Sequence, residues 1–266
     1  MIQLASAIAI SLYLLAAVLE ARQLRGAVAL RSRLPVGLAA VAALIHAYCA
    51  YAGIRTEHGI DLGFFPVSSL IAWIVVTLTL LGSLRRPLQS LLVVLLPLAA
   101  LAIAVPLGVS GPGHKLHSMS DGVLAHILLS ILAYSVLAIA ALQAGALAIQ
   151  ERQLKTRQVR GLIQMLPPLQ TMEALLFEII WVGVILLALA ILTGFAFVDN
   201  LFAQHLVHKT VLSIIAWVIF ALLLWGRHRW GWRGHTAIRW TAGGFAVLVL
   251  AYFGTKLVLE LILQRG

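Results

Sequence analysis

The sequence has few charged residues and a single cysteine. Of its 266 residues, 11% are charged and 62% are hydrophobic, whereas a soluble domain is about 25% charged and about 45–50% apolar. This shortage of polar surface excludes a soluble enzyme. It also excludes intrinsic disorder, which requires a polar chain. Because Cys49 is alone, neither an internal disulfide nor a CxxC redox pair can form.

Motifs of catalysis are missing as well. The sequence contains no GxSxG, no HExxH and no Walker loop, the patterns that mark common nucleophilic, zinc-dependent and phosphate-binding sites. No hydrophobic stretch holds a pair of aspartates, and no nucleophile stands with a base and an orienting acid. We therefore expect a protein that is not an enzyme.

Long hydrophobic runs dominate the chain instead. A bilayer core of about 30 Å is crossed by roughly 20 apolar residues in a helix. The runs are continuous rather than alternating, which is typical of helices and not of membrane strands. The sequence predicts an all-α, polytopic integral membrane helix bundle, one transmembrane domain over residues 1–266, with four spans within 1–110. The eight expected spans are 2–19, 35–54, 64–83, 87–109, 122–148, 173–198, 210–226 and 239–262.

The net charge of +10 is located mainly in the connections after the first, third, fifth and seventh spans. These connections hold Arg22, Arg25, Arg31, Arg33, Arg85, Arg86, Arg152, Lys155, Arg157, Arg160, Arg227, Arg229, Arg233 and Arg239. Because positively charged loops stay in the cytoplasm, both termini are predicted outside it. The charge then sets topology and contacts anionic membrane lipids. No nucleic-acid partner is expected, since no basic domain could dock a duplex.

The longest connection, residues 149–172, is basic and amphipathic in its first half, and Pro167 and Pro168 end it. We expect this segment to lie along the membrane surface. Glu173 or Glu178, at the start of the next span, would pair with its basic residues. The tryptophans that flank the last connection are predicted to form an interfacial aromatic belt: Trp225, Trp230, Trp232 and Trp240.

Histidine is the most informative polar residue. Nine histidines occur, and most fall in the predicted outer half: His46, His58, His114, His117, His126, His205 and His208. Neutral imidazole ligates haem iron, zinc, copper and nickel. A cluster at one face therefore predicts a haem or metal near that face. The alternative is that loop histidines are simply polar residues at an interface, the interpretation we favour for His58, His114 and His235.

His46 lies inside the span 35–54, where an ionisable side chain is costly and usually faces the bundle interior. Cys49, Ala50 and Gly53 share its helix face, and this stripe of small residues would admit a flat ligand. His46 is thus a candidate haem or metal ligand. The alternative is a histidine hydrogen-bonded to a neighbouring helix.

His126 opens the span 122–148, and Ser130 and Tyr134 follow at i+4 and i+8, so a polar stripe runs down one helix face. We take His126 as a second candidate haem or metal ligand and Tyr134 as a candidate cofactor-binding residue. His205 and His208 are spaced i,i+3 and can hold one ligand together if they are helical.

Between residues 120 and 262 the chain resembles a known family. The motifs are His126 with LSILAY, Leu192-Thr193-Gly194, Lys209 with Trp217 eight residues on, GWRG at 231–234, and Tyr252-Phe253-Gly254. Together they are similar to the cytochrome c assembly family, the haem-handling membrane proteins of the CcsA and CcmC type. Within it, the small YpjD-like and HemX-like inner-membrane proteins are most alike.

The resemblance implies a multi-pass protein of the bacterial inner membrane that binds b-type haem, with His126 as the external-side haem histidine. His46 is similar in placement to a within-membrane ligand. The implied role is in cytochrome c biogenesis or in the regulation of haem synthesis, with haem and proteins of those processes as partners.

Three positions depart from the family pattern. The external segment between Gly194 and Lys209 has no tryptophan, a second external histidine is replaced by Leu263, and a within-membrane histidine is replaced by Trp225. One hypothesis is that His205 or His208 substitutes as a ligand. Two other functions stay open: a divalent metal ion transport or tolerance protein, and a non-catalytic membrane assembly partner.

Overall fold

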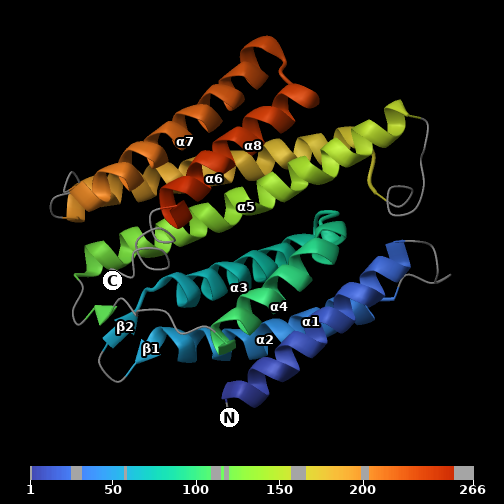
Figure 1. Cartoon of the computed structure of the whole chain (residues 1–266). Helices are drawn as coiled ribbons and strands as arrows, with labels where there is room; N and C mark the ends of the chain where they lie inside the picture. The colour runs from blue at the N-terminus through green and yellow to red at the C-terminus, as the bar shows by residue number, and fades with distance from the viewer. Residues whose placement is uncertain are drawn as a thin grey trace. The chain divides into compact units, whose positions relative to one another are not determined.

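The computed structural model of the chain describes residues 2–24, 32–56, 59–108, 115–116, 120–156, 166–198 and 204–254. The chain divides into two compact units (Figure 1). Unit 1 comprises Met1–His117 with Arg152–Pro168, and unit 2 comprises Ser118–Glu151 with Leu169–Gly266.

Each of the first seven predicted spans falls on a helix, and the described part of the eighth falls on the last helix and the turn that follows it. The helices are α1 (Ile2–Leu24), α2 (Leu34–Ile54), α3 (Phe64–Ser83), α4 (Leu92–Gly108), α5 (Asp121–Lys155), α6 (Leu169–Phe197), α7 (Gln204–Trp230) and α8 (His235–Val249). A 3-10 turn, η1 (Gln89–Leu91), precedes α4, and a π-helical turn, η3 (Leu250–Gly254), continues α8.

Within the described residues, the helices from α1 to α7 are each long and apolar enough to cross a membrane. The last part of the eighth predicted span, residues 255–262, lies outside the described residues. The prediction of an all-α, polytopic membrane bundle is confirmed, and the orientation of the termini stays a prediction.

Unit 1 packs its four spans in sequence order, with α1 against α2 and α4, α2 against α3, and α3 against α4. The facing surfaces of α1 and α2 are rich in alanine, and Ala9, Ala16, Ala39 and Ala42 are completely buried. Small side chains let helix backbones approach closely, which is how helices associate in lipid without a hydrophobic driving force.

Three short strands, β1 (Arg55–Thr56), β2 (Gly59–Asp61) and β3 (Lys115–Leu116), form an antiparallel sheet in the order β1-β2-β3. They join the α2–α3 connection to the α4–α5 connection, so both connections lie at the same end of unit 1, as an up-and-down order of spans requires. The hydrophobic pattern of the sequence did not predict these strands, because they lie in the connections.

Unit 2 packs α6 on α7 and α7 on α8. Helix α5 continues beyond its predicted end at 148, as far as Lys155. Residues 149–155, predicted to lie along the membrane surface, therefore extend α5 instead. The reason is local: ERQLK consists of strong helix formers without glycine or proline.

Candidate functional site

The half-buried imidazole of His126 connects α5 to α6. Its Nδ1 lies 2.8 Å from the backbone carbonyl oxygen of Ala190. A carbonyl only accepts hydrogen bonds, so Nδ1 must carry the proton and Nε2 keeps its lone pair. No other hydrogen bond to this ring comes from the described residues. An imidazole whose tautomer is fixed by a carbonyl in this way is prepared to ligate a metal through its other nitrogen.

Space for this ring is provided by Gly194. A Cβ atom at this position would lie 2.9 Å from Cε1 and 3.1 Å from Nδ1 of His126. Next to it, the Thr193 hydroxyl donates to the carbonyls of Leu189, at 2.8 Å, and Ala190, at 3.0 Å. Ala190, Thr193 and Gly194 thus form a seat for the imidazole, named here the imidazole seat. The sequence motif Leu192-Thr193-Gly194 marked its position but not its contact with His126.

His46 has no exposed surface, and both of its ring nitrogens have partners. Nδ1 lies 3.2 Å from the Tyr13 hydroxyl, and Nε2 lies 3.0 Å from the Ser69 hydroxyl. The rings of Tyr13 and His46 meet edge to face at 5.7 Å between centroids. Ligation through either nitrogen would break one of these bonds and would need an opening for the cofactor. The geometry therefore favours the alternative stated above, a histidine hydrogen-bonded to neighbouring helices.

The partners of His46 were missed in the sequence. On α1, the buried polar residues Ser6, Tyr13 and Glu20 follow one another at seven-residue intervals, so they lie on one helix face. Ser6 contacts the thiol of Cys49 at 3.6 Å. The spacing was the available signal, and it indicates that α1 presents a polar stripe to α2 within unit 1.

Tyr134 is buried on the same face of α5 as His126. It lies eight residues, and therefore about 12 Å, further along the helix. Its ring packs against Phe245 of α8 and Tyr252 of η3, at 5.4 and 6.1 Å between centroids. These contacts join α5 to α8 and η3 within unit 2. Its position as a cofactor-binding residue stays a prediction.

For the other candidate histidines the structure describes fewer contacts. His205 and His208 both lie in the first turns of α7, so the helical condition for their pairing is met, and His208 is exposed. The side chains of His58, His114, His117 and His205 lie outside the described residues. In the part of the chain that the structure describes, no three His, Cys, Asp or Glu side chains gather as metal ligands.

Comparison with known proteins identifies the family. The sequence model described as "Cytochrome C assembly protein" matches residues 36–263. The chain belongs to the cytochrome c assembly protein family. The resemblance read from the motifs in 120–262 is confirmed, and the match extends over the second, third and fourth spans.

Several bacterial proteins are similar to this chain. The inner membrane protein YpjD of Escherichia coli K12 is 34% identical over 232 residues, 86% of this chain and 88% of YpjD. Protein HemX of Brevibacillus brevis is 22% identical over 85% of this chain and 87% of HemX. The cytochrome c biogenesis protein CcsA of Synechocystis is 27% identical over 43% of this chain and 35% of CcsA. No solved structure matches. With its apolar helices, the chain is a multi-pass protein of the bacterial inner membrane.

The GWRG motif of this family member forms the turn between α7 and α8. Gly231 and Gly234 have φ of +67° and +53°, values that disfavour residues with a side chain. The Trp232 backbone N–H donates to the Gly226 carbonyl at 3.2 Å, and a Cβ at Gly226 would collide with the Trp232 ring. The glycines of this turn are thus required by backbone conformation and close packing.

A carboxylate of α6 holds the same turn in place. Arg227 donates to Glu173 at 2.7 Å and to the Trp232 carbonyl at 3.3 Å, and the Gly234 N–H donates to Glu173 at 3.4 Å. Glu173 or Glu178 was expected to pair with the connection 149–172, and the structure pairs Glu173 with Arg227 at the end of α7. The stacked indoles of the predicted aromatic belt lie beside the turn, with centroid distances of 4.9, 5.4 and 5.1 Å along Trp225, Trp230, Trp232 and Trp240.

Proposed function

We propose that this chain binds b-type haem and acts in cytochrome c biogenesis or in the regulation of haem synthesis, with His126 as a residue that would hold the haem iron. The observation that carries the proposal is the hydrogen bond from His126 Nδ1 to the Ala190 carbonyl. It leaves Nε2 as a lone-pair donor, the form of imidazole that haem iron takes. Family membership supports a haem-related role in the membrane.

In this proposal the protein supplies a ligand and its orientation, and catalysis is not part of its role. The Ala190 carbonyl keeps the proton on Nδ1 and fixes the direction of the Nε2 lone pair. Gly194 leaves the ring room to keep that orientation. When bound, haem supplies the iron centre and its redox chemistry.

A second ligand is proposed from the start of α7. His205 and His208 lie one turn apart at the beginning of α7, the helix that follows the imidazole seat in the sequence. His46 is left out of the proposed ligand set because both of its nitrogens are hydrogen-bonded. A His205→Ala/His208→Ala variant that keeps an unchanged haem spectrum would remove this pair from the site.

The experiment is a visible absorption spectrum of the full-length protein in detergent, as purified, after dithionite, and after titration with hemin. We expect a Soret band whose intensity per protein falls at least about tenfold in His126→Ala, the scale on which metal sites respond to lost ligand interactions. His228→Ala is the matched control, because His228 is an exposed histidine of the same unit. Its spectrum should equal that of the wild type.

A His126→Gly variant separates ligation from folding. Added imidazole can enter the space of the missing side chain and restore the Soret band if His126 is a ligand. A wild-type protein that is colourless and does not take up hemin would refute the proposed function, as would a His126→Ala variant with an undiminished Soret band.

A further inference from the structure

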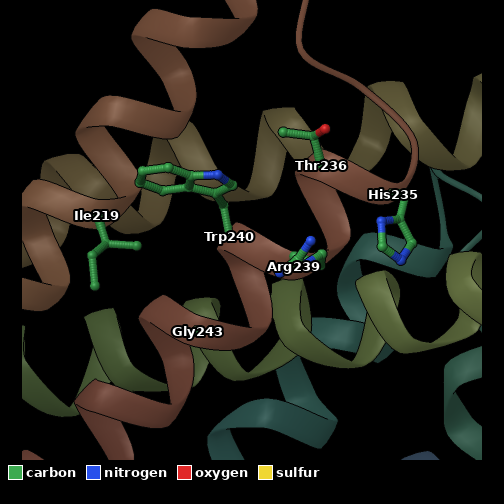
Figure 2. Close-up of a pocket in the computed structure, with 6 residues that line it drawn as sticks. All are labelled: Ile219, His235, Thr236, Arg239, Trp240 and Gly243. Carbon is green, nitrogen blue, oxygen red and sulfur yellow. The ribbon is translucent and has the colours of Figure 1, made fainter.

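A pocket in unit 2 opens between α7 and the beginning of α8, apart from the imidazole seat (Figure 2). Its volume is about 430 Å³. It is lined by Ile219 of α7 and by His235, Thr236, Arg239, Trp240 and Gly243 of α8. Figure 2 shows the indole of Trp240 extending from α8 toward α7, on which Ile219 lies.

The lining changes from polar to apolar along α8. The first turn contributes the imidazole of His235 and the hydroxyl of Thr236, and Arg239 stands one turn further. Gly243 comes eight residues, about 12 Å, after the start of the helix. An occupant of matching chemistry has a polar, hydrogen-bonding head and an apolar continuation.

The charge of the polar end is positive. His235 and Arg239 are exposed, and neither has a carboxylate partner among the described residues. The first turn of α8 contains no acidic residue. Both carboxylates near Gly234 are engaged elsewhere: Glu173, which contacts the backbone of Gly234, is paired with Arg227. Glu151, whose Oε1 would lie 3.8 Å from a Cβ at Gly234, makes an interaction of its own. The polar head that fits this end is therefore an anion.

We propose that this pocket binds an anionic phospholipid, with its phosphate at Arg239 and His235 and the start of an acyl chain along Trp240, Gly243 and Ile219. Guanidinium forms charge-assisted hydrogen bonds with phosphate oxygens, and tryptophan favours the level of the lipid headgroups. The pocket opens at the end of unit 2 that carries the basic α7–α8 connection, where anionic lipids concentrate. This inference is independent of the proposed haem site.

The test is native mass spectrometry of the full-length protein in detergent with phosphatidylglycerol or phosphatidylcholine at equal concentration. We expect tighter binding of phosphatidylglycerol. Arg239→Gln should weaken it about fivefold, the factor for about 1 kcal/mol per basic side chain at a lipid surface. Arg229→Gln is the matched control, since Arg229 is exposed near the same turn but does not line the pocket, and it should leave binding unchanged.

A second variant tests the apolar part. Gly243 lines the pocket, and a Cβ at this position meets no atom within 4 Å, so the side chain of Gly243→Leu should occupy part of the pocket and reduce phosphatidylglycerol binding. Gly145→Leu, at another open helical glycine of unit 2, should not.

Three results would overturn the proposal. One is equal binding of the two lipids. Another is unchanged binding in Arg239→Gln or Gly243→Leu. The third concerns the melting temperature of the protein. If inorganic phosphate alone raises it as much as phosphatidylglycerol does, the pocket belongs to a free anion and not to a lipid.

Discussion

The two units of the chain each place a histidine inside a membrane helix, and the two histidines are held in different ways. In unit 1, His46 is completely buried and both ring nitrogens are hydrogen-bonded to hydroxyl groups. In unit 2, His126 is half-buried, and among the described residues its ring makes one hydrogen bond, from Nδ1 to a carbonyl. Depth in the membrane made both residues candidates. The number of free lone pairs distinguishes them.

From this difference we predict opposite roles for the two residues. A histidine whose nitrogens both have partners stabilises the bundle, because an unpaired polar group in the membrane interior is expensive. A histidine with one oriented nitrogen leaves the other for a ligand. Stability and haem binding should therefore respond separately to substitutions in the two units.

The largest expected effect on stability is that of His46→Ala. The change leaves the hydroxyls of Tyr13 and Ser69 without their partner and opens a cavity, so we expect the free energy of unfolding to fall by about 3–5 kcal/mol. His126→Ala should cost less than about 2 kcal/mol, since it removes one hydrogen bond. SDS-induced unfolding in detergent, followed by circular dichroism, measures both. The reverse order of the two costs would contradict the comparison.

Gly194→Ala should affect both stability and haem binding. The new Cβ would lie 2.9 Å from His126 Cε1, so the ring or α6 must shift, at a cost of about 1–3 kcal/mol. The proposed ligand would then be misplaced, and the Soret maximum of the reconstituted protein should move. Gly145→Ala is the control, because a Cβ there meets nothing within 4 Å. An unaltered spectrum in Gly194→Ala would argue against the imidazole seat as part of a haem site.

Tyr13→Phe and Ser69→Ala each remove one hydrogen bond from His46. Each should lower the free energy of unfolding by about 1 kcal/mol and leave haem content unchanged. Because both act through the same ring, the double variant should depart from additivity by at least about 0.5 kcal/mol. Simple addition of the two effects would mean that the hydroxyls do not share His46.

The smallest effect is expected for Ser6→Ala, at about 0.5 kcal/mol or less. Its hydroxyl contacts the Cys49 sulfur at 3.6 Å, and a thiol is a weak hydrogen-bonding group. The same unfolding measurement applies. A loss as large as that of Ser69→Ala would place Ser6 within the essential part of the His46 network.

The membrane spans could be predicted from the sequence because a long hydrophobic run in lipid has one helical solution. Details at the helix ends could not. Helix α5 exceeds its hydrophobic run because polar residues with high helix propensity extend it to Lys155. Strands β2 and β3 pair segments that are about 55 residues apart, a contact that local patterns do not contain.

The candidate site was predicted in part. The candidates His46 and His126 could be found by residue type and depth, but their difference depends on partners 23, 33 and 64 residues away in sequence. The partner of His126 is a backbone carbonyl, which any residue at position 190 would provide. No side-chain pattern could have revealed it. The pocket beside α8 likewise depends on how α7 packs against residues that follow it.

The backbone nature of that acceptor has a consequence for tolerance to mutation. A side chain that orients a ligand is lost with one nucleotide change, whereas the carbonyl of residue 190 survives every replacement that preserves the helix. Substitutions at residue 190 should therefore leave the orientation of the His126 imidazole unchanged. A substitution at position 194 is different. Any side chain there adds a Cβ atom against the His126 ring and would change the distance between α5 and α6.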